Sequence, residues 1–279
     1  MQIISQLEEN IVVRPNSIEI NEALADEYVK QKRWEEAVRV YQSLLALYPA
    51  TASLFVNRIR LGATALATSS LLVLLAGLIH PLIPNPELYP SAFAQALHST
   101  KYLTAQTLLL VAFPLFSTSA ISIYKLLSYT RDHRSAFWAM VFSVIGVGLS
   151  MPSLGINMIV LPLIARLYLE GELQTLNIYL AMQGMPWSLI LRLGDYVFVL
   201  GIAIFSWVIL RNKNFPKWSV VLFLAGWITF IAPITSIRLN MIIAGSLIFI
   251  GGIELARSAW IQASLQFQPI TVSAQKVDS

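Results

Sequence analysis

The side chains that could do chemistry in this sequence are a few polar residues set inside or beside long apolar segments. Arg192 and Asp195 lie three positions apart, so on a helix they share one face and can form an ion pair. Arg238 and Asn240 begin a later apolar segment, and Asn157 lies near the end of an earlier one. Polar groups in such surroundings are costly, which makes these five residues the candidate polar cluster of the chain.

Two interpretations of this cluster stay open. The polar side chains can line a small cavity that takes a ligand. Alternatively, Arg192 and Asp195 form a structural ion pair in which the arginine extends its charge toward lipid head groups.

Catalytic and metal-binding motifs are missing from the sequence. There is no cysteine, which excludes disulfides, thiolate catalysis and cysteine-bound metals. His80, His98 and His133 are not spaced as a helical metal-binding pair requires. No Gly-x-Ser-x-Gly, P-loop or Gly-x-Gly-x-x-Gly motif occurs. We therefore expect a protein that is not an enzyme and holds no cofactor and no metal.

The composition is that of an integral membrane protein. Hydrophobic residues make up 56% of the 279 residues and charged residues only 12%, with a mean hydropathy of +0.66. Soluble domains carry about 25% charged residues. The net charge of +4 does not indicate nucleic-acid binding, because basic loops that orient a membrane protein account for it.

The apolar segments predict an all-α transmembrane bundle. A spanning helix needs about 20 mostly apolar residues. We expect spans at 61–79, 102–124, 135–157, 187–210, 218–235 and 237–257. Pro114 is expected to kink the second span. The third is expected to bend at Pro152 and to continue as an interfacial segment to about residue 170.

Basic residues near the span ends predict the orientation. The first set of ends is the more basic and is placed in the cytoplasm: Arg58, Arg60, Lys125, Arg131, Arg134, Arg211, Lys213, Lys217 and Arg257. The opposite set has Lys101, Arg166, Arg192 and Arg238. With no cleavable signal peptide expected, both termini are cytoplasmic, and the membrane is a bacterial inner membrane or a thylakoid.

A second pattern lies ahead of the first span. Large, small and aromatic residues and a closing proline recur at set positions: Leu24, Ala25, Tyr28, Trp34, Ala37, Tyr41 and Pro49. Residues 18–51 resemble a tetratricopeptide repeat over its 34-residue length. Asn21 and Leu44 depart from the family pattern. Pro15 precedes Pro49 by one repeat length, so residues 2–13 are expected to form a helix of a truncated preceding repeat.

The resemblance implies a small helical head that binds a cytoplasmic protein. Solenoids of this kind need about three repeats for stability, so the head is expected to lean on the membrane domain, a partner or a second copy of the chain. The alternative is a helical hairpin that only caps the cytoplasmic face. The expected domains are the head at 1–55, the membrane domain at 56–260 and a polar, disordered tail at 261–279.

The membrane domain also resembles an uncharacterised bacterial six-helix family over residues 58–258, most closely over 192–228. That resemblance implies no activity. The leading hypothesis is a membrane-anchored scaffold that recruits a partner through its head. The alternative is a transporter or sensor of a small molecule or lipid that uses the candidate polar cluster.

Overall fold

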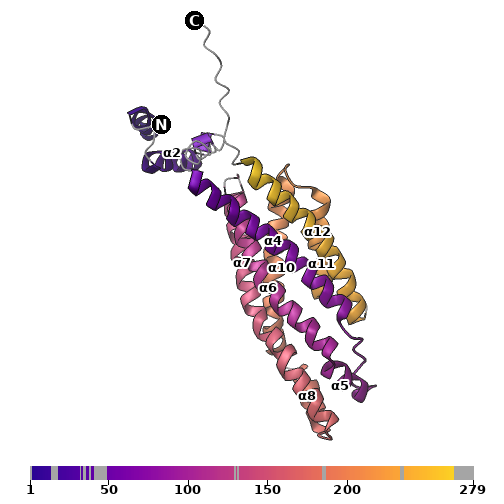
Figure 1. Ribbon diagram of the computed structural model, residues 1–279. Helices are drawn as coiled ribbons and strands as arrows, with labels where there is room; N and C mark the ends of the chain where they lie inside the picture. The colour runs from indigo at the N-terminus through magenta and orange to yellow at the C-terminus, as the bar shows by residue number, and fades with distance from the viewer. Residues whose placement is uncertain are drawn as a thin grey trace.

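The computed structural model describes residues 2–13, 18–31, 33, 36–37, 39–40, 49–128, 130, 132–183, 187–232 and 236–266. In this part of the chain all regular structure is helical, and the longest helices lie side by side in one elongated bundle (Figure 1). The helices are α1 (Gln2–Val13), α2 (Ile18–Lys30), α4 (Pro49–Ile79), α5 (Pro90–His98), α6 (Thr100–Leu127), α7 (His133–Gly155), the π-helix η1 (Ile156–Val160), α8 (Leu161–Leu169), α9 (Gln174–Gln183), α10 (Trp187–Arg211), α11 (Lys217–Ile231) and α12 (Ile237–Gln266).

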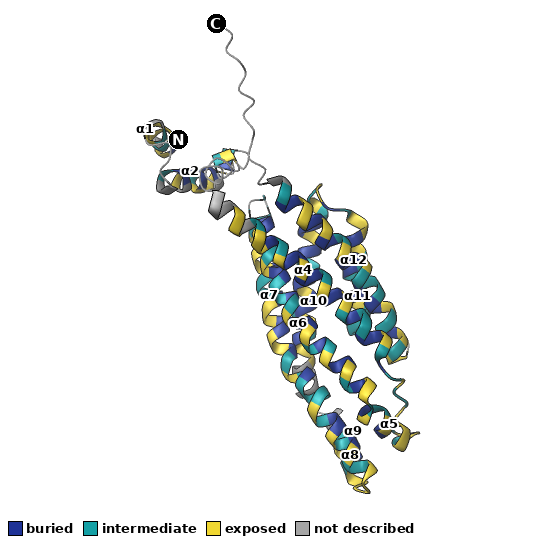
Figure 2. Ribbon diagram, in the orientation of Figure 1, coloured by how far each residue is buried: buried dark blue, intermediate teal, exposed yellow. Residues whose placement is uncertain are grey.

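Five helical segments of the described chain are long and apolar enough to cross a membrane, as the sequence predicts of an integral membrane protein. They are Val56–Ile79, Thr100–Leu127, His133–Leu169, Arg192–Arg211 and Ile237–Ser264. The segment expected as the fifth of six spans is the shorter helix α11, which has 15 residues. Exposed positions run along the outer sides of the long helices (Figure 2), and many are large apolar residues such as Trp138, Ile145 and Trp207.

The third expected span is part of a longer helical path. Helices α7, η1 and α8 form one continuous helical path of 37 residues through Pro152. At about 1.5 Å per residue this path is about 55 Å long, so its last part extends past the roughly 30 Å of bilayer hydrocarbon. We call the end of the bundle at α8 the cap end, and the opposite end, where α4 begins, the head end.

The expected domain boundaries also fall inside helices. Helix α4 begins at Pro49 and runs without interruption into the first span, so no break occurs between residues 55 and 56. Proline suits the first turn of a helix because its missing N–H has no partner there in any case. Helix α12 continues to Gln266, past the expected start of the tail at 261, and residues 267–279 lie outside the described part.

Helices α7 and α10 pack antiparallel through small residues. A methyl group added to Gly146 would collide with the backbone nitrogen of Phe198, and one added to Gly194 would collide with that of Ser150. One added to Gly201 would lie 2.5 Å from the backbone nitrogen of Ser143. Small residues let transmembrane helices approach this closely. These contacts fix the register of the two helices along their whole shared length.

Glycines also join α4 to α6 and α12, and α11 to α12. A methyl group on Gly62 of α4 would collide with Ser122 of α6, and one on Gly77 with the backbone of Met241 of α12. One on Gly251 of α12 would lie 2.6 Å from the backbone of α11 at Phe223. These helix pairs are therefore held at backbone contact distance, like α7 and α10.

Aromatic side chains fill the middle of the bundle. Trp227 of α11 is fully buried, and its ring centroid lies 4.6 Å from that of Phe198 and 4.9 Å from that of Phe116. The rings of Phe113 and Phe230 lie 5.9 Å and 5.5 Å from it. Such edge-on ring pairs add to the stabilisation that burial provides.

Three short helices cover the cap end. Helices α5 and α8 pack on each other, and α9 folds back on α8 after Gly171, which has a φ of 108°. Their shared core includes Phe93, Leu97 and Leu161, together with Tyr102 of α6. This cap is thus tied to the bundle through the first turn of α6.

The head contains helices α1 and α2. Ile4, Leu24, Tyr28 and Ala37 form a small buried core, and Ala25 is fully buried. The Tyr28 hydroxyl donates a hydrogen bond to the Glu8 carboxylate, and burial, followed by this bond, raises the pKa of Tyr28 to about 12.

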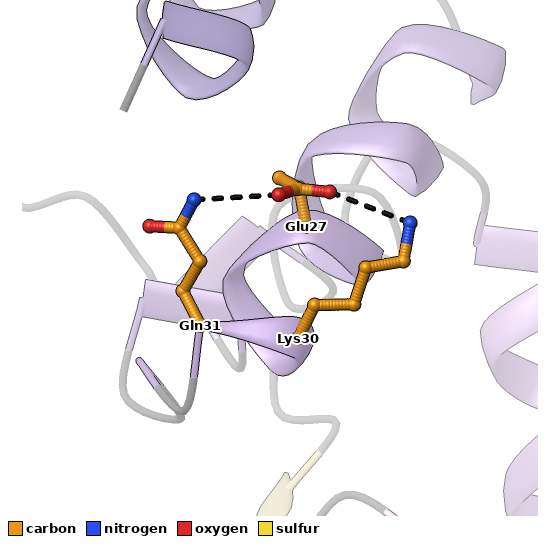
Figure 3. A network of polar contacts seen from close by, with 3 residues as sticks. All are labelled: Glu27, Lys30 and Gln31. Atoms are coloured by element: carbon orange, nitrogen blue, oxygen red, sulfur yellow. Dashed lines mark hydrogen bonds and ion pairs between the residues drawn. The ribbon is translucent and has the colours of Figure 1, made fainter.

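On the exposed face of α2, Glu27 accepts hydrogen bonds from Lys30 and Gln31 at 3.4 Å and 3.3 Å (Figure 3). Two of the repeat-motif residues, Trp34 and Tyr41, lie outside the described residues. The buried motif positions among the described residues are Leu24, Ala25, Tyr28 and Ala37.

Candidate functional site

A cavity of about 280 Å³ lies at the cap end of the bundle, lined by five helices, by η1 and by the loop that follows α4. One polar lining residue directly follows α4, and the others belong to α6, α7, η1, α10 and α12. In chain order they are His80, Tyr102, Gln106, Ser150, Ser153, Asn157, Asp195 and Asn240. Its apolar lining includes Phe113 and Phe230. A mostly apolar cavity with a few convergent polar groups is the usual form of a small-molecule site.

Asp195 carries the charge of this cavity. Its carboxylate accepts a hydrogen bond of 2.6 Å from the hydroxyl of Ser150, which is buried on the facing helix α7. Gly194 lies directly against Ser150, so the close approach of α10 and α7 brings the two side chains together. A short bond of this kind to an ionised acceptor is among the stronger hydrogen bonds in proteins.

Asn157 reaches the cavity from the π-helix. In η1 the backbone N–H of Leu161 bonds to the carbonyl of Ile156, five residues earlier, which widens the helix by one residue. Segments of this kind occur frequently at functional sites. The widened turn lies where α7 passes from the membrane bundle into the cap, and Asn157 is part of the cavity wall at this point.

His80 and Tyr102 form the wall on the side of α4 and α6. The two rings meet edge to face with centroids 5.6 Å apart, and both side chains are buried. His80 Nδ1 lies 3.0 Å from the carbonyl oxygen of Pro81, so Nδ1 carries the hydrogen and Nε2 is the free acceptor. Burial, aided by the charge of Arg238, lowers the pKa of His80, so the ring is neutral at pH 7.

Gln106 adds an unpartnered polar group. Its side chain is 6% exposed, and its Oε1 has no hydrogen-bond partner among the described residues. Leaving such a group buried and unpaired costs about 1–3 kcal/mol.

The structure brings together some residues of the predicted polar cluster and separates others. Asp195, Asn157 and Asn240 all line the cavity. The Asn240 amide nitrogen also donates to the carbonyl of Thr229 at 2.7 Å, which joins α12 to α11.

The two arginines of the cluster do not line the cavity. Arg192 is exposed, and no ion pair of the described residues joins it to Asp195, contrary to the pairing expected from their spacing. Asp195 instead bonds to Ser150. Arg238 is half-buried near His80, and its Nε has no hydrogen-bond partner among the described residues.

A second, more open hollow lies at the head end. It is lined by Thr130, Asp132, Val208 and the turn after α10, and it measures about 890 Å³. Arg211 forms an ion pair with Asp132 at 3.4 Å, and its guanidinium lies over the ring of Trp207. These contacts pair the charges of Arg211 and Asp132 within the protein, so the hollow is the weaker candidate.

The described residues contain no group of three or more His, Cys, Asp or Glu side chains that could hold a metal ion. No protein-family model, curated protein or solved structure matches this chain on comparison. The function of the chain is therefore inferred from the residues that line the cavity at the cap end.

Acidification is expected to destabilise the protein through His80. In the unfolded chain this ring takes up a proton near its ordinary pKa of about 6.5, whereas the folded protein holds its pKa lower. The stabilisation is complete above about pH 6.5 and is lost as the pH falls toward the folded pKa, because the unfolded state then binds more protons. Thermal unfolding of the detergent-solubilised protein between pH 7.5 and 5 measures this loss.

The matched variant is His80→Asn, whose amide can keep the bond to the carbonyl of Pro81 without titrating. Its unfolding temperature is expected to depend less on pH over this range than that of the unchanged protein. An equal dependence would show that the other titrating groups are responsible.

Deleting Ile159 is expected to leave the cap in place. A π-helix holds one residue more than the α-helix around it, so removing one residue restores α-helical bonding and keeps the flanking register. Deleting Leu149 from α7 instead turns all later residues by about 100°. A cysteine at Ala165, which is 2% exposed, reports the difference: a thiol reagent should label Ala165→Cys after the second deletion but not after the first. Labelling after both would show that η1 is not a one-residue insertion.

Proposed function

We propose that this chain is an integral membrane protein that binds a small polar molecule in the cavity at the cap end, as a transporter or a sensor. The observation that carries the proposal is the carboxylate of Asp195, held by Ser150 inside an otherwise largely apolar helical bundle. Ionisable residues within membrane helices are expensive and are commonly retained for function.

The alternative, a purely structural role for Asp195, fits the surroundings less well. A structural carboxylate would have its acceptors used by protein donors, but among the described residues Asp195 accepts a side-chain hydrogen bond from Ser150 alone. The neighbouring Gln106 also keeps a buried oxygen without a partner in the same part of the chain. Two underused acceptors around one cavity favour a ligand site.

Cysteine labelling tests whether the cavity is open to water. The chain has no native cysteine, so a single introduced thiol gives no background. Ser153 lines the cavity, whereas Leu149, one turn away on α7, is 44% exposed on the outer surface of the bundle. A charged thiol reagent is expected to label Ser153→Cys and to spare Leu149→Cys, because only a thiol in contact with water ionises readily. Equal labelling of both, or of neither, would count against the site.

We also propose six membrane crossings, with α11 as the fifth. Its first residue, Lys217, follows the head end of α10 by a short turn, and Phe230 near its last residue lines the cavity at the cap end. A helix of 15 residues is about 22 Å long, so it crosses most of the hydrocarbon. The basic residues at the head end support placing both termini in the cytoplasm of a bacterial cell or the equivalent side of a thylakoid.

A second proposed function is recruitment of a cytoplasmic protein by a tetratricopeptide-like head at residues 1–55. It is supported by the burial of Leu24, Ala25, Tyr28 and Ala37, which are the apolar positions such a repeat places between its helices. The same head could serve contact with a second copy of the chain. We likewise propose, on the sequence resemblance, that residues 58–258 are related to the six-helix bacterial family.

Crosslinking in membranes tests the head. The full chain carrying a photoreactive residue at Ala23, an exposed position of α2, should crosslink to one distinct protein. The same photoreactive residue at Glu87, exposed in the loop before α5, is the control for non-specific capture. Identical crosslinked species from both sites, or none from Ala23, would contradict recruitment through α2.

A further inference from the structure

We infer that the ligand of the cap-end cavity is a small organic cation, namely a protonated amine that carries a short apolar group. This inference rests on the proposed binding function of the cavity. It follows from the charge of the lining, the acceptors that the lining offers, and the aromatic walls.

The charge of the cavity is negative. Asp195 is the acidic side chain of the lining, and the described lining residues include no lysine or arginine. The charge of Arg192 acts on Asp195 only from an exposed position outside the lining. His80 adds no positive charge, because burial lowers its pKa. A partly buried carboxylate with no ion-pair partner among the described residues is unfavourable. A bound cation would supply the missing partner, whereas an anionic ligand would add to the penalty.

Three groups of the lining offer acceptors. Asp195 has accepting capacity beyond the single bond from Ser150. Gln106 offers an oxygen that is unpartnered among the described residues, and His80 offers Nε2 because its Nδ1 hydrogen is directed to the carbonyl of Pro81. An ammonium group has three N–H donors and no acceptor, so it complements this set.

The rest of the lining suits an organic ammonium better than a metal ion. Phe113, Phe230 and Tyr102 present aromatic rings, which attract cations over their faces and also accommodate apolar groups. Divalent cations take about six or more oxygen ligands, usually with several carboxylates, and the described residues hold no acidic or histidine cluster of that kind. The volume of about 280 Å³ lies just below the range of sites for drug-sized molecules, so it limits the ligand to a small molecule.

Three probes of the same shape and different charge test the inference: benzylammonium, benzyl alcohol and benzoate. Binding to the purified full-length protein is measured by calorimetry at pH 7.5. Benzylammonium is expected to bind at least about tenfold more tightly than benzyl alcohol, because hydrogen bonds to charged groups are stronger than those between neutral ones. Benzoate is expected not to bind measurably.

The variant Asp195→Asn keeps the shape and the acceptor for Ser150 but removes the charge, and it should bind benzylammonium and benzyl alcohol equally. Asp132→Asn, which removes a carboxylate at the head end, is the matched control and should keep the preference. The three probes on the unchanged protein test the inference even if Asp195→Asn does not fold.

Other outcomes separate the inference from the proposed function. Equal binding of the alcohol, or tighter binding of benzoate, overturns the cation inference while a binding cavity remains. Sodium or potassium ions that stabilise the protein in place of the amine, with loss of the effect in Asp195→Asn, overturn it in favour of an inorganic cation. If no probe binds while Ser153→Cys is labelled, only the ligand class fails. If Ser153→Cys is also unlabelled, both fail.

Discussion

Replacing Trp227 by alanine is expected to destabilise the membrane bundle by about 3–5 kcal/mol, the usual cost of deleting a large buried aromatic side chain. The indole is fully buried and packs against Phe113, Phe116 and Phe198, so its removal leaves a cavity that neighbouring rings cannot fill without moving helices. Trp227→Phe is expected to cost much less. The indole Nε1 has no hydrogen-bond partner among the described residues, so phenylalanine loses volume but no bond.

Thermal unfolding in detergent measures the effect. At about 2–4 °C per kcal/mol for a chain of this size, Trp227→Ala should lower the unfolding temperature by roughly 6–20 °C. Trp218→Ala is the matched control, because Trp218 lies on the same helix and is 52% exposed. A similar fall for both alanine variants would mean that tryptophan content rather than the buried aromatic cluster sets the stability.

The second large effect is expected at Gly146. Its alanine variant should lose about 1–3 kcal/mol, because inserted atoms in a packed interface force strain or backbone shifts. The added methyl would collide with the Phe198 nitrogen and lie 2.5 Å from its Cα, and backbone atoms can yield only if α10 moves away. Since Ser150 and Asp195 belong to the same helix pair, ligand binding should weaken together with stability.

Gly148 provides the control on the same helix. A methyl group added there meets nothing within 4 Å. Gly148→Ala should therefore be neutral or more stable by about 0.5–1 kcal/mol, the usual gain from replacing a glycine inside a helix. The unfolding temperatures of Gly146→Ala and Gly148→Ala, measured under the same conditions, test this difference in stability. Equal behaviour would contradict close packing of α7 on α10.

The general fold could be predicted because long apolar segments have few alternatives. A membrane excludes unpaired backbone groups, so runs such as 61–79 and 102–124 must be helical. The count of crossings is harder, since α11 is short and the path through α7, η1 and α8 is long. The sequence Ile156–Val160 carries no signal for a π-helix, and the sequence gives no sign that helical structure continues from Pro152 to Leu169.

The site could be predicted only in part. Asp195, Asn157 and Asn240 stand out in the sequence because each is polar within an apolar stretch, and all three line the cavity. Gln106 lies in the same kind of stretch, near the start of α6, but one uncharged amide there is weaker evidence than a charge, so the sequence does not single it out.

The other differences between the predicted and the observed site come from tertiary contacts. Which face of α10 meets α7 depends on glycines whose partners lie on another helix, so the bond from Ser150 to Asp195 could not be read from spacing. The same contact leaves Arg192 on the exposed side. His80 follows an apolar run directly, and its burial depends on Tyr102, which the sequence places 22 positions away.

The close glycine contacts fall into two groups of membrane helices. One group is α7 with α10, and the other is α4 with α6, α11 and α12, since every close glycine contact of the described residues lies within one group. The seam between them is aromatic, with Phe198 on one side and Trp227 on the other. The cavity lies at this same seam, with Asp195 in the first group and Gln106 in the second. A change in how the two groups pack would therefore alter the binding site without separating any glycine-packed pair.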